Sequence, residues 1–253
     1  MTDVFIAGAA MTRFGRRPEG LPELMAEAAI GAMTATNRFH PEAIFVGTMN
    51  PEEFVGDACF STLFADYLGR AHTPSLRVET GTSSGAAALS AAWAAIASGQ
   101  YRETLVVAGE KMTRLPTPRV TEILSRMLDP VERAYGASMP ALAAIVCRAY
   151  MRAHGLDGKD LAWIPVKNHK NGARNPYAHF QREVSLDEVL GSRMISDPLR
   201  LYEVCPISDG ASAVLLTCEP GPTRIAGIGQ GTDHIGLRNR DSLISFRATQ
   251  EAA

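Results

Sequence analysis

Short β-rich apolar runs alternate with segments of helical periodicity along the first part of this chain. The apolar runs are VFIAGAA at 4–10, AIFVGTMN at 43–50, SLRVET at 75–80 and ETLVVAGEKM at 103–112. The segments between them place apolar residues at helical spacing, over 21–33, 59–68 and 84–98. This alternation predicts an α/β fold with a largely parallel sheet, because crossover helices join parallel strands.

The rhythm changes between residues 113 and 200. Proline-marked loops surround helical stretches, and the polar run KNHKNGARNP at 167–176 leads to a short helix predicted near 185–190. A further strand, DGASAVLLT at 209–217, then rejoins the core. We therefore interpret 113–200 as an inserted domain, and insertions of this size are usually lids or binding loops.

A short repeat follows the linker EPGP at 219–222. Ile225-Ala226-Gly227 repeats Ile6-Ala7-Gly8, and in both copies a leucine-led amphipathic segment opens further along the chain. The order and similar spacing of these two elements indicate a duplicated fold. We expect 225–229 to be the first strand of the second copy and 242–253 the start of its helix.

Charge and composition exclude several classes of function. The 253 residues carry a formal net charge of −2, which argues against binding to nucleic acid. The sequence contains no run of eighteen apolar residues, so we expect no membrane span. Its start has no basic region, so we expect no signal peptide. The four cysteines form no C-x-x-C pair, so we expect neither a metal site nor disulfides, and a cytoplasmic location.

The stretch GTSSG at 81–85 leaves three interpretations open. G-x-S-x-G between a strand and a helix outlines a serine-hydrolase nucleophile turn, with Ser83 as the nucleophile. The small residues could instead serve only tight packing of the helix start. The third interpretation is a helix N-terminus that activates a nucleophile by its free N–H groups, although Thr82 is a poor one.

Six segments resemble a thiolase, in the branch that includes sterol-carrier-protein-type and archaeal enzymes. They are FIAGAAMTRFG at 5–15, VETGTSSGAAAL at 78–89, VVAGEKMT at 106–113, VKNHKNGARNP at 166–176, DPLRLYEVCPISDGASAVLLT at 197–217 and IAGIGQGTD at 225–233. The resemblance implies an N-terminal βαβαβαββ half with an inserted loop domain. It divides the chain into a core of 1–112 and 201–222, the loop domain of 113–200, and 223–253 as the beginning of a truncated C-terminal half.

One departure from the family concerns its nucleophile. In active thiolases the segment that GTSSG resembles reads A-C-x-S-G, and its cysteine carries the acyl group. Carried over by position, that cysteine is Thr82 here. The family's other catalytic groups belong to the second half. The resemblance therefore implies an acyl-CoA-binding chain that performs no Claisen chemistry alone and belongs to a split or heteromeric acyltransferase of lipid metabolism.

The resemblance also implies where CoA binds and what the alternatives are. Tyr135, Gly136 and Met139 lie in the segment that in the family approaches the pantetheine arm of CoA. The simpler alternative is that Tyr135 is a packed aromatic residue. His169 could contact a CoA phosphate, or it could lie at the solvent-exposed end of a helix. No cofactor is expected to be covalently bound.

Relatives without the cysteine resemble retro-aldolases that act on β-hydroxyacyl-CoA with an OB-fold/zinc-ribbon partner. Besides such a heteromer, a homo-oligomer of this chain is expected as the alternative assembly.

Overall fold

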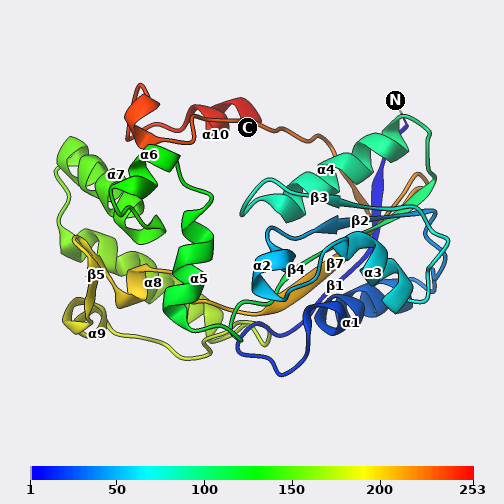
Figure 1. Ribbon diagram of the computed structural model, residues 1–253, viewed down its shortest axis with the longest axis horizontal. Helices are drawn as coiled ribbons and strands as arrows, with labels where there is room; N and C mark the ends of the chain where they lie inside the picture. Colours follow the sequence, from blue (N-terminus) through cyan, green and yellow to red (C-terminus); the bar gives the residue numbers. More distant parts are fainter. Residues whose placement is uncertain (1) are drawn as a thin grey trace. The chain divides into compact units, whose positions relative to one another are not determined.

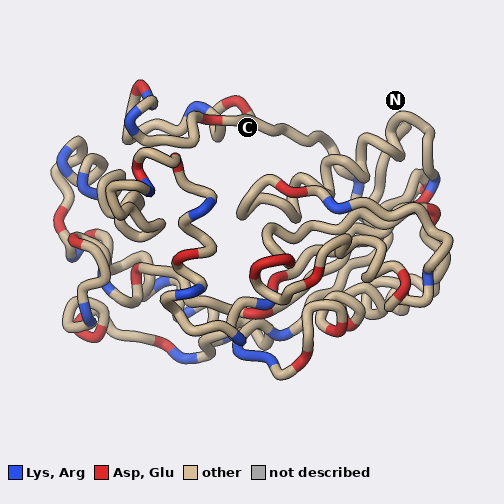
Figure 2. Tube along the Cα trace, in the orientation of Figure 1, with Lys and Arg blue, Asp and Glu red and all other residues tan. Residues whose placement is uncertain are grey.

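The computed structural model describes residues 2–253, which form two compact units (Figure 1). The first unit contains residues 2–115 and Ser208–Ile228, and the second contains Pro116–Ile207 and Gly229–Ala253. Basic and acidic residues are interspersed in each unit (Figure 2). Within residues 2–253, no helix combines the length and the apolar character needed to cross a bilayer.

The first unit follows the predicted βαβαβαββ order. Its elements are β1 (Phe5–Met11), α1 (Leu21–Thr34), β2 (Ala43–Gly47), α2 (Pro51–Phe54), α3 (Phe60–Tyr67), β3 (Ser75–Val78), α4 (Ser84–Ala97), β4 (Glu103–Glu110), β7 (Gly210–Thr217) and β8 (Thr223–Arg224). The six strands form one sheet in the order β3-β2-β4-β7-β1-β8. The α/β fold class and the predicted helices and strands up to residue 217 are confirmed.

The prediction of a largely parallel sheet was wrong. Only the pairs β2–β3 and β2–β4 are parallel, whereas β7 runs antiparallel to both β4 and β1, and β8 runs antiparallel to β1. The sheet is therefore mixed. Strand β7 is buried on both faces, and such a strand reads as a continuous apolar run whichever way it points.

Helices cover both faces of the sheet (Figure 1). On one face, α1 and α3 pack against a cluster that includes Ile44, Leu105 and Val107. On the other face, α4 packs against Phe45 and Val106. Side chains alternate along a strand, so the even-numbered residues of β4 face α4 and the odd-numbered residues face α1.

The second unit is mainly helical. Its elements are α5 (Thr117–Ser125), α6 (Pro130–Ala134), α7 (Met139–His154), α8 (Gly158–Gly172), α9 (Leu186–Gly191), β5 (Met194–Ser196), β6 (Leu199–Arg200), α10 (Arg247–Ala252) and the short 3₁₀ turns Leu201–Glu203 and Leu237–Asn239. Asp157 and Ser185 begin α8 and α9 with reciprocal capping boxes. The helix predicted near 185–190 is α9.

The predicted elements after residue 222 needed correction. Strand β8 covers only Thr223–Arg224. Beyond it, Ile225 N–H donates a hydrogen bond of 2.9 Å to the carbonyl oxygen of Val4, the residue before β1. Residues 226–229 form no strand, because glycine weakens strands and recurs at 227 and 229. The helix predicted over 242–253 is limited to Arg247–Ala252. The assignment of 223–253 to a second thiolase half stays a prediction.

Candidate functional site

The turn between β3 and α4 is held by hydrogen bonds among its own residues. Gly81 adopts a left-handed φ of 62°, and its N–H donates to the Glu79 carboxylate. The Ser84 hydroxyl donates to Gly81 O at 2.6 Å and accepts from Thr80 N–H at 3.1 Å. The chain thus places Thr82 two residues before the first residue of a 14-residue helix.

Thr82, the position that resembles the family nucleophile, lies exposed on this turn. Among residues 2–253, no group forms a hydrogen bond with its hydroxyl, so no base is placed to take the proton. A helix dipole stabilises an adjacent anion by about 0.3–1 kcal/mol, and by up to about 2 kcal/mol in favourable geometry. That contribution is too small to ionise an alcohol near neutral pH.

Ser83, the candidate nucleophile of a serine hydrolase, occupies the N-cap position of α4. Its hydroxyl donates to Thr80 O at 2.9 Å and shares a second hydrogen bond of 2.9 Å with Thr80 Oγ1. A serine nucleophile requires a histidine within hydrogen-bond reach. None contacts Ser83 in the described part of the chain, so its bonds tie the turn together instead.

Two glycines allow the strand ends to approach the first turn of α4. A Cβ atom on Gly47 would lie 2.8 Å from the Gly85 Cα and 2.8 Å from the Ser84 O. A Cβ atom on Gly85 would lie 3.0 Å from the Ala108 Cβ. The carboxyl ends of β2 and β4 therefore press directly against the helix start that follows Thr82.

Glu110, the last residue of β4, is a titratable group of this region that the sequence did not single out. Its Oε1 accepts from Thr48 Oγ1 at 3.0 Å and from Met49 N–H. Its Oε2 is buried and has no hydrogen-bond partner within residues 2–253. Burial is the largest effect on this carboxyl and raises its pKa to about 7. The only available signal was an acidic residue ending an otherwise apolar run.

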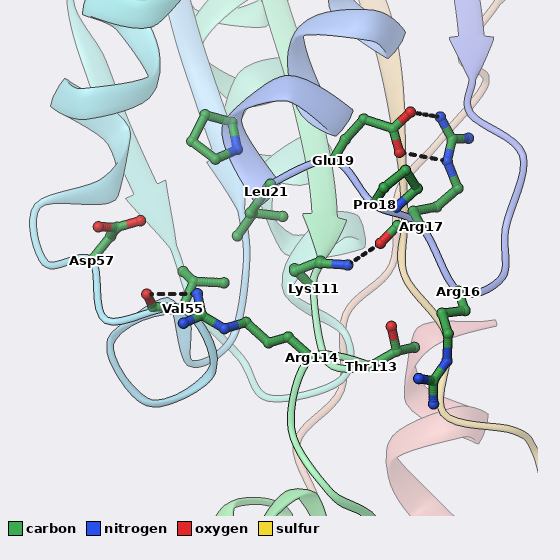
Figure 3. Close-up of a pocket in the computed structure, with 12 residues that line it drawn as sticks. Arg16, Arg17, Pro18, Glu19, Leu21, Val55, Asp57, Lys111, Thr113 and Arg114 are labelled. Atoms are coloured by element: carbon green, nitrogen blue, oxygen red, sulfur yellow. Dashed lines mark hydrogen bonds and ion pairs between the residues drawn. The ribbon is translucent and has the colours of Figure 1, made fainter.

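A pocket of about 660 Å³ lies elsewhere in the first unit, next to the N-terminus of α1 (Figure 3). Arginine and lysine side chains line it, but most are committed to protein contacts. Arg17 pairs with Glu19, Lys111 Nζ donates to Arg17 O, and Arg114 donates to Val55 O. Thr82 and Glu110 do not line this pocket.

The predicted CoA-contacting residues all belong to the second unit but lie in two places. Tyr135 is 89% exposed at the end of α6, Gly136 follows it with a φ of 82°, and Met139 begins α7. His169 lies on α8, where its ring stacks on Phe180. These four positions remain expectations as CoA contacts.

His169 belongs to a second pocket, of about 690 Å³, within the second unit. Its Nδ1 is 3.2 Å from Arg182 O, and its ring meets Tyr202 edge-on at 5.5 Å between ring centroids. Tyr135, Gly136 and Met139 do not line this pocket. His169 thus lies in the last turn of α8 with its ring on the pocket wall, and both interpretations of it stay predictions.

Comparison with known proteins identifies the family. The family model "Thiolase, N-terminal domain" matches residues 4–220. The acetyl-CoA acetyltransferase of Methanothermobacter thermautotrophicus is 34% identical over 267 residues, which cover 100% of this chain and 68% of that protein. The benzoylsuccinyl-CoA thiolase subunit BbsB of Thauera aromatica is 33% identical, over 88% of this chain and 60% of the relative.

Sterol carrier protein 2 of Oryctolagus cuniculus is also similar, at 30% identity over 85% of this chain and 41% of that protein. Among solved structures, the Ltp2-ChsH2(DUF35) aldolase superposes with a TM-score of 0.79 and 21% identity, covering 98% of this chain and 68% of that chain. The fold is thus that of a thiolase N-terminal domain. The chain belongs to the thiolase family, and its similarity to archaeal and sterol-carrier-protein-type members confirms the predicted branch.

Proposed function

We propose that this chain binds an acyl-CoA thioester and does not carry the acyl group covalently. The observation that carries the proposal is the exposed Thr82 hydroxyl, which has no hydrogen-bonded base in the described chain. The names of the relatives support the ligand class, because they include acetyl-CoA acetyltransferases. Thr82 keeps the position of the family nucleophile without the chemistry of a thiolate.

The CoA part of the ligand is assigned to residues of the second unit. Tyr135 offers an exposed ring at the α6–α7 connection, and Gly136 and Met139 continue that surface. His169 offers a ring on the wall of the pocket beside α8. An exposed aromatic ring can pack against a ligand and gains from burial. All four residues belong to the second unit.

We propose that formation or cleavage of a carbon–carbon bond, unlike ligand binding, requires a second protein component. A relative at 33% identity is named as a thiolase subunit, and the aldolase with the same fold is named for two components, Ltp2 and ChsH2(DUF35). These names support a heteromeric enzyme. In such an enzyme the partner would supply catalytic groups whose role the Thr82 hydroxyl cannot take over. An OB-fold/zinc-ribbon protein is the partner expected for the lyase alternative below.

Retro-aldol cleavage of a β-hydroxyacyl-CoA is the second candidate function. The superposition with an aldolase over 98% of the chain favours it. So does the chemistry, because retro-aldol cleavage requires a base and stabilisation of an enolate rather than an acyl-thioester intermediate. The absence of a thiol at position 82 therefore leaves this reaction available. Conversion of 3-hydroxybutyryl-CoA to acetaldehyde and acetyl-CoA would report it.

Isothermal titration calorimetry with acetyl-CoA tests the ligand assignment. We expect saturable binding, weakened in Tyr135→Ala and in His169→Ala. Tyr177→Ala is the matched control, because Tyr177 is a half-exposed tyrosine of the same unit that does not line the α8 pocket. A folded wild-type chain that shows no saturable binding would contradict the proposed function.

A further inference from the structure

Glu110 lies on the same face of the sheet as the start of α4. It is two residues beyond Ala108 on β4, and residues two apart on a strand point to the same side. The Ala108 side chain meets Gly85 in the first turn of α4. Strands β3, β2 and β4 are parallel, so Glu110 lies at the same edge of the sheet as the turn that holds Thr82.

The surroundings of Glu110 supply donors to one carboxyl oxygen only. Thr48 and Met49, which directly follow β2, both donate to Oε1. Oε2 is buried without a partner among the described residues, and such an oxygen is stabilised by a proton or by a ligand donor. Glu110 as a whole is half-buried, so the side chain is not sealed from the surface.

The charges around Glu110 leave its ionisation balanced near neutrality. Burial is the dominant influence and favours the neutral acid, while the two donated hydrogen bonds and the positive charge of Arg77 on β3 favour the carboxylate. Arg77 itself pairs with Glu52. Lys111, the next residue after β4, pairs instead with Asp209. A carboxyl that titrates near the working pH suits proton transfer in either direction.

We propose that Glu110 is the acid–base residue of this chain, exchanging a proton with the α-carbon of an acyl-CoA held at the Thr82 turn. The Glu110 carboxylate takes the α-proton, the C–H electron pair forms the C=C bond of the enolate, and the thioester oxygen takes the negative charge. In the reverse step, the carboxylic acid returns its proton to the α-carbon. The same return of a proton completes a retro-aldol cleavage. This assignment rests on the proposed binding of acyl-CoA.

Exchange of the α-protons of acetyl-CoA for deuterium in D₂O, followed by NMR, tests the assignment. The wild-type chain should catalyse exchange, with a rate that rises through neutral pH as Glu110 ionises. Glu110→Gln should lower the rate at least tenfold, whereas Glu110→Asp should retain part of it because the carboxylate is kept. Glu103→Gln is the matched control: it removes a carboxylate from the opposite end of β4 and should leave exchange unchanged.

Calorimetric binding and circular dichroism separate the ways in which the experiment can fail. If folded wild-type protein does not bind acetyl-CoA, the proposed function is wrong and the role of Glu110 falls with it. If it binds acetyl-CoA but catalyses no exchange, or if Glu110→Gln exchanges as fast as wild type, binding stands and the Glu110 assignment is overturned. If Glu110→Gln does not fold, an unaltered pH profile and rate in folded Glu110→Asp would overturn it.

Discussion

The Asp209 carboxylate accepts a hydrogen bond from Lys111 Nζ at 2.7 Å, and the two side chains are 0% and 8% exposed. The same carboxylate accepts from the backbone N–H groups of Met112 at 2.9 Å, Thr113 at 2.8 Å and Arg17 at 3.1 Å. One buried anion thus fastens the end of β4, the start of β7 and the segment before α1. Its partners satisfy the charge that burial would otherwise penalise.

Replacement of Asp209 by Ala should strongly destabilise the protein. The substitution would leave the Lys111 ammonium buried without its counter-ion, and removing one partner of a buried pair costs about 3–5 kcal/mol of unfolding free energy. Urea denaturation measures the change. Glu219→Gln, which breaks an exposed ion pair with Arg38, should cost less than about 1 kcal/mol. Equal effects of the two variants would refute the anchoring role of Asp209.

Glu110 should make the protein less stable as the pH rises from about 4.5 to about 7. Its folded-state pKa is about 7 against an ordinary value of 4.5, because burial favours the neutral acid. Over that interval the folded state holds a proton that the unfolded state releases, so the unfolding free energy falls with pH and levels off above it. At about 1.4 kcal/mol per pKa unit, the loss over this interval amounts to about 3–4 kcal/mol.

Urea denaturation at a series of pH values tests this dependence. The wild-type chain and Glu103→Gln should both show the decline, while Glu110→Gln should lack the part that Glu110 contributes. Parallel pH profiles for wild type and Glu110→Gln would mean that this carboxyl titrates in its ordinary range, and the account of its burial would be wrong.

The first unit's fold could be predicted from the sequence because its strands and helices differ in periodicity. Continuous apolar runs identified β2 and β4, and helical spacing identified α1 and α4. The direction of β7 could not be predicted in the same way, because burial on both faces removes any alternating pattern. The sheet order depends on pairings between residues about two hundred positions apart, such as Ala10 with Ala213.

The candidate site was only partly predictable, for a different physical reason. Thr82 stood out because a turn and a helix start are encoded locally in GTSSG. Glu110 depends on Thr48 and Met49, and Asp209 on Lys111, so their roles arise from contacts between distant segments. The local sequence around Asp209 indicates only a turn and cap residue. A single acidic residue at a strand end carries no pattern that reveals such contacts.

Strand β3 lies at the edge of the sheet and should mediate self-association. Its outer side has no neighbouring strand in the described chain, and Leu76 on it is 44% exposed. Open edges of this kind favour pairing with another chain. Light scattering at micromolar concentration should give a dimer or larger species, shifted toward monomer by Leu76→Arg. Ile30→Arg, at an exposed site on α1, is the control. A monomeric wild type would contradict the prediction.

A cysteine at position 82 should recover part of the family's chemistry. The first turn of a helix leaves N–H groups without intrahelical partners, and these lower the pKa of a thiol held close to them. In Thr82→Cys, the introduced thiol should therefore react with iodoacetamide at pH 7 faster than Cys59, which is also exposed. Peptide mass mapping distinguishes the sites. A slower reaction than that of Cys59 would show that the turn does not activate a thiol.

The most direct measurement for the whole account is the intact mass of the purified chain after incubation with acetyl-CoA. Since Thr82 has neither a thiol nor a hydrogen-bonded base in the described structure, the mass should be unchanged even when calorimetry shows acetyl-CoA bound. A stable increase of about 42 Da, the mass of an acetyl group, that disappears in Thr82→Ala would establish an acyl-enzyme. That result would contradict the claim that this thiolase-family chain binds acyl-CoA without covalent transfer.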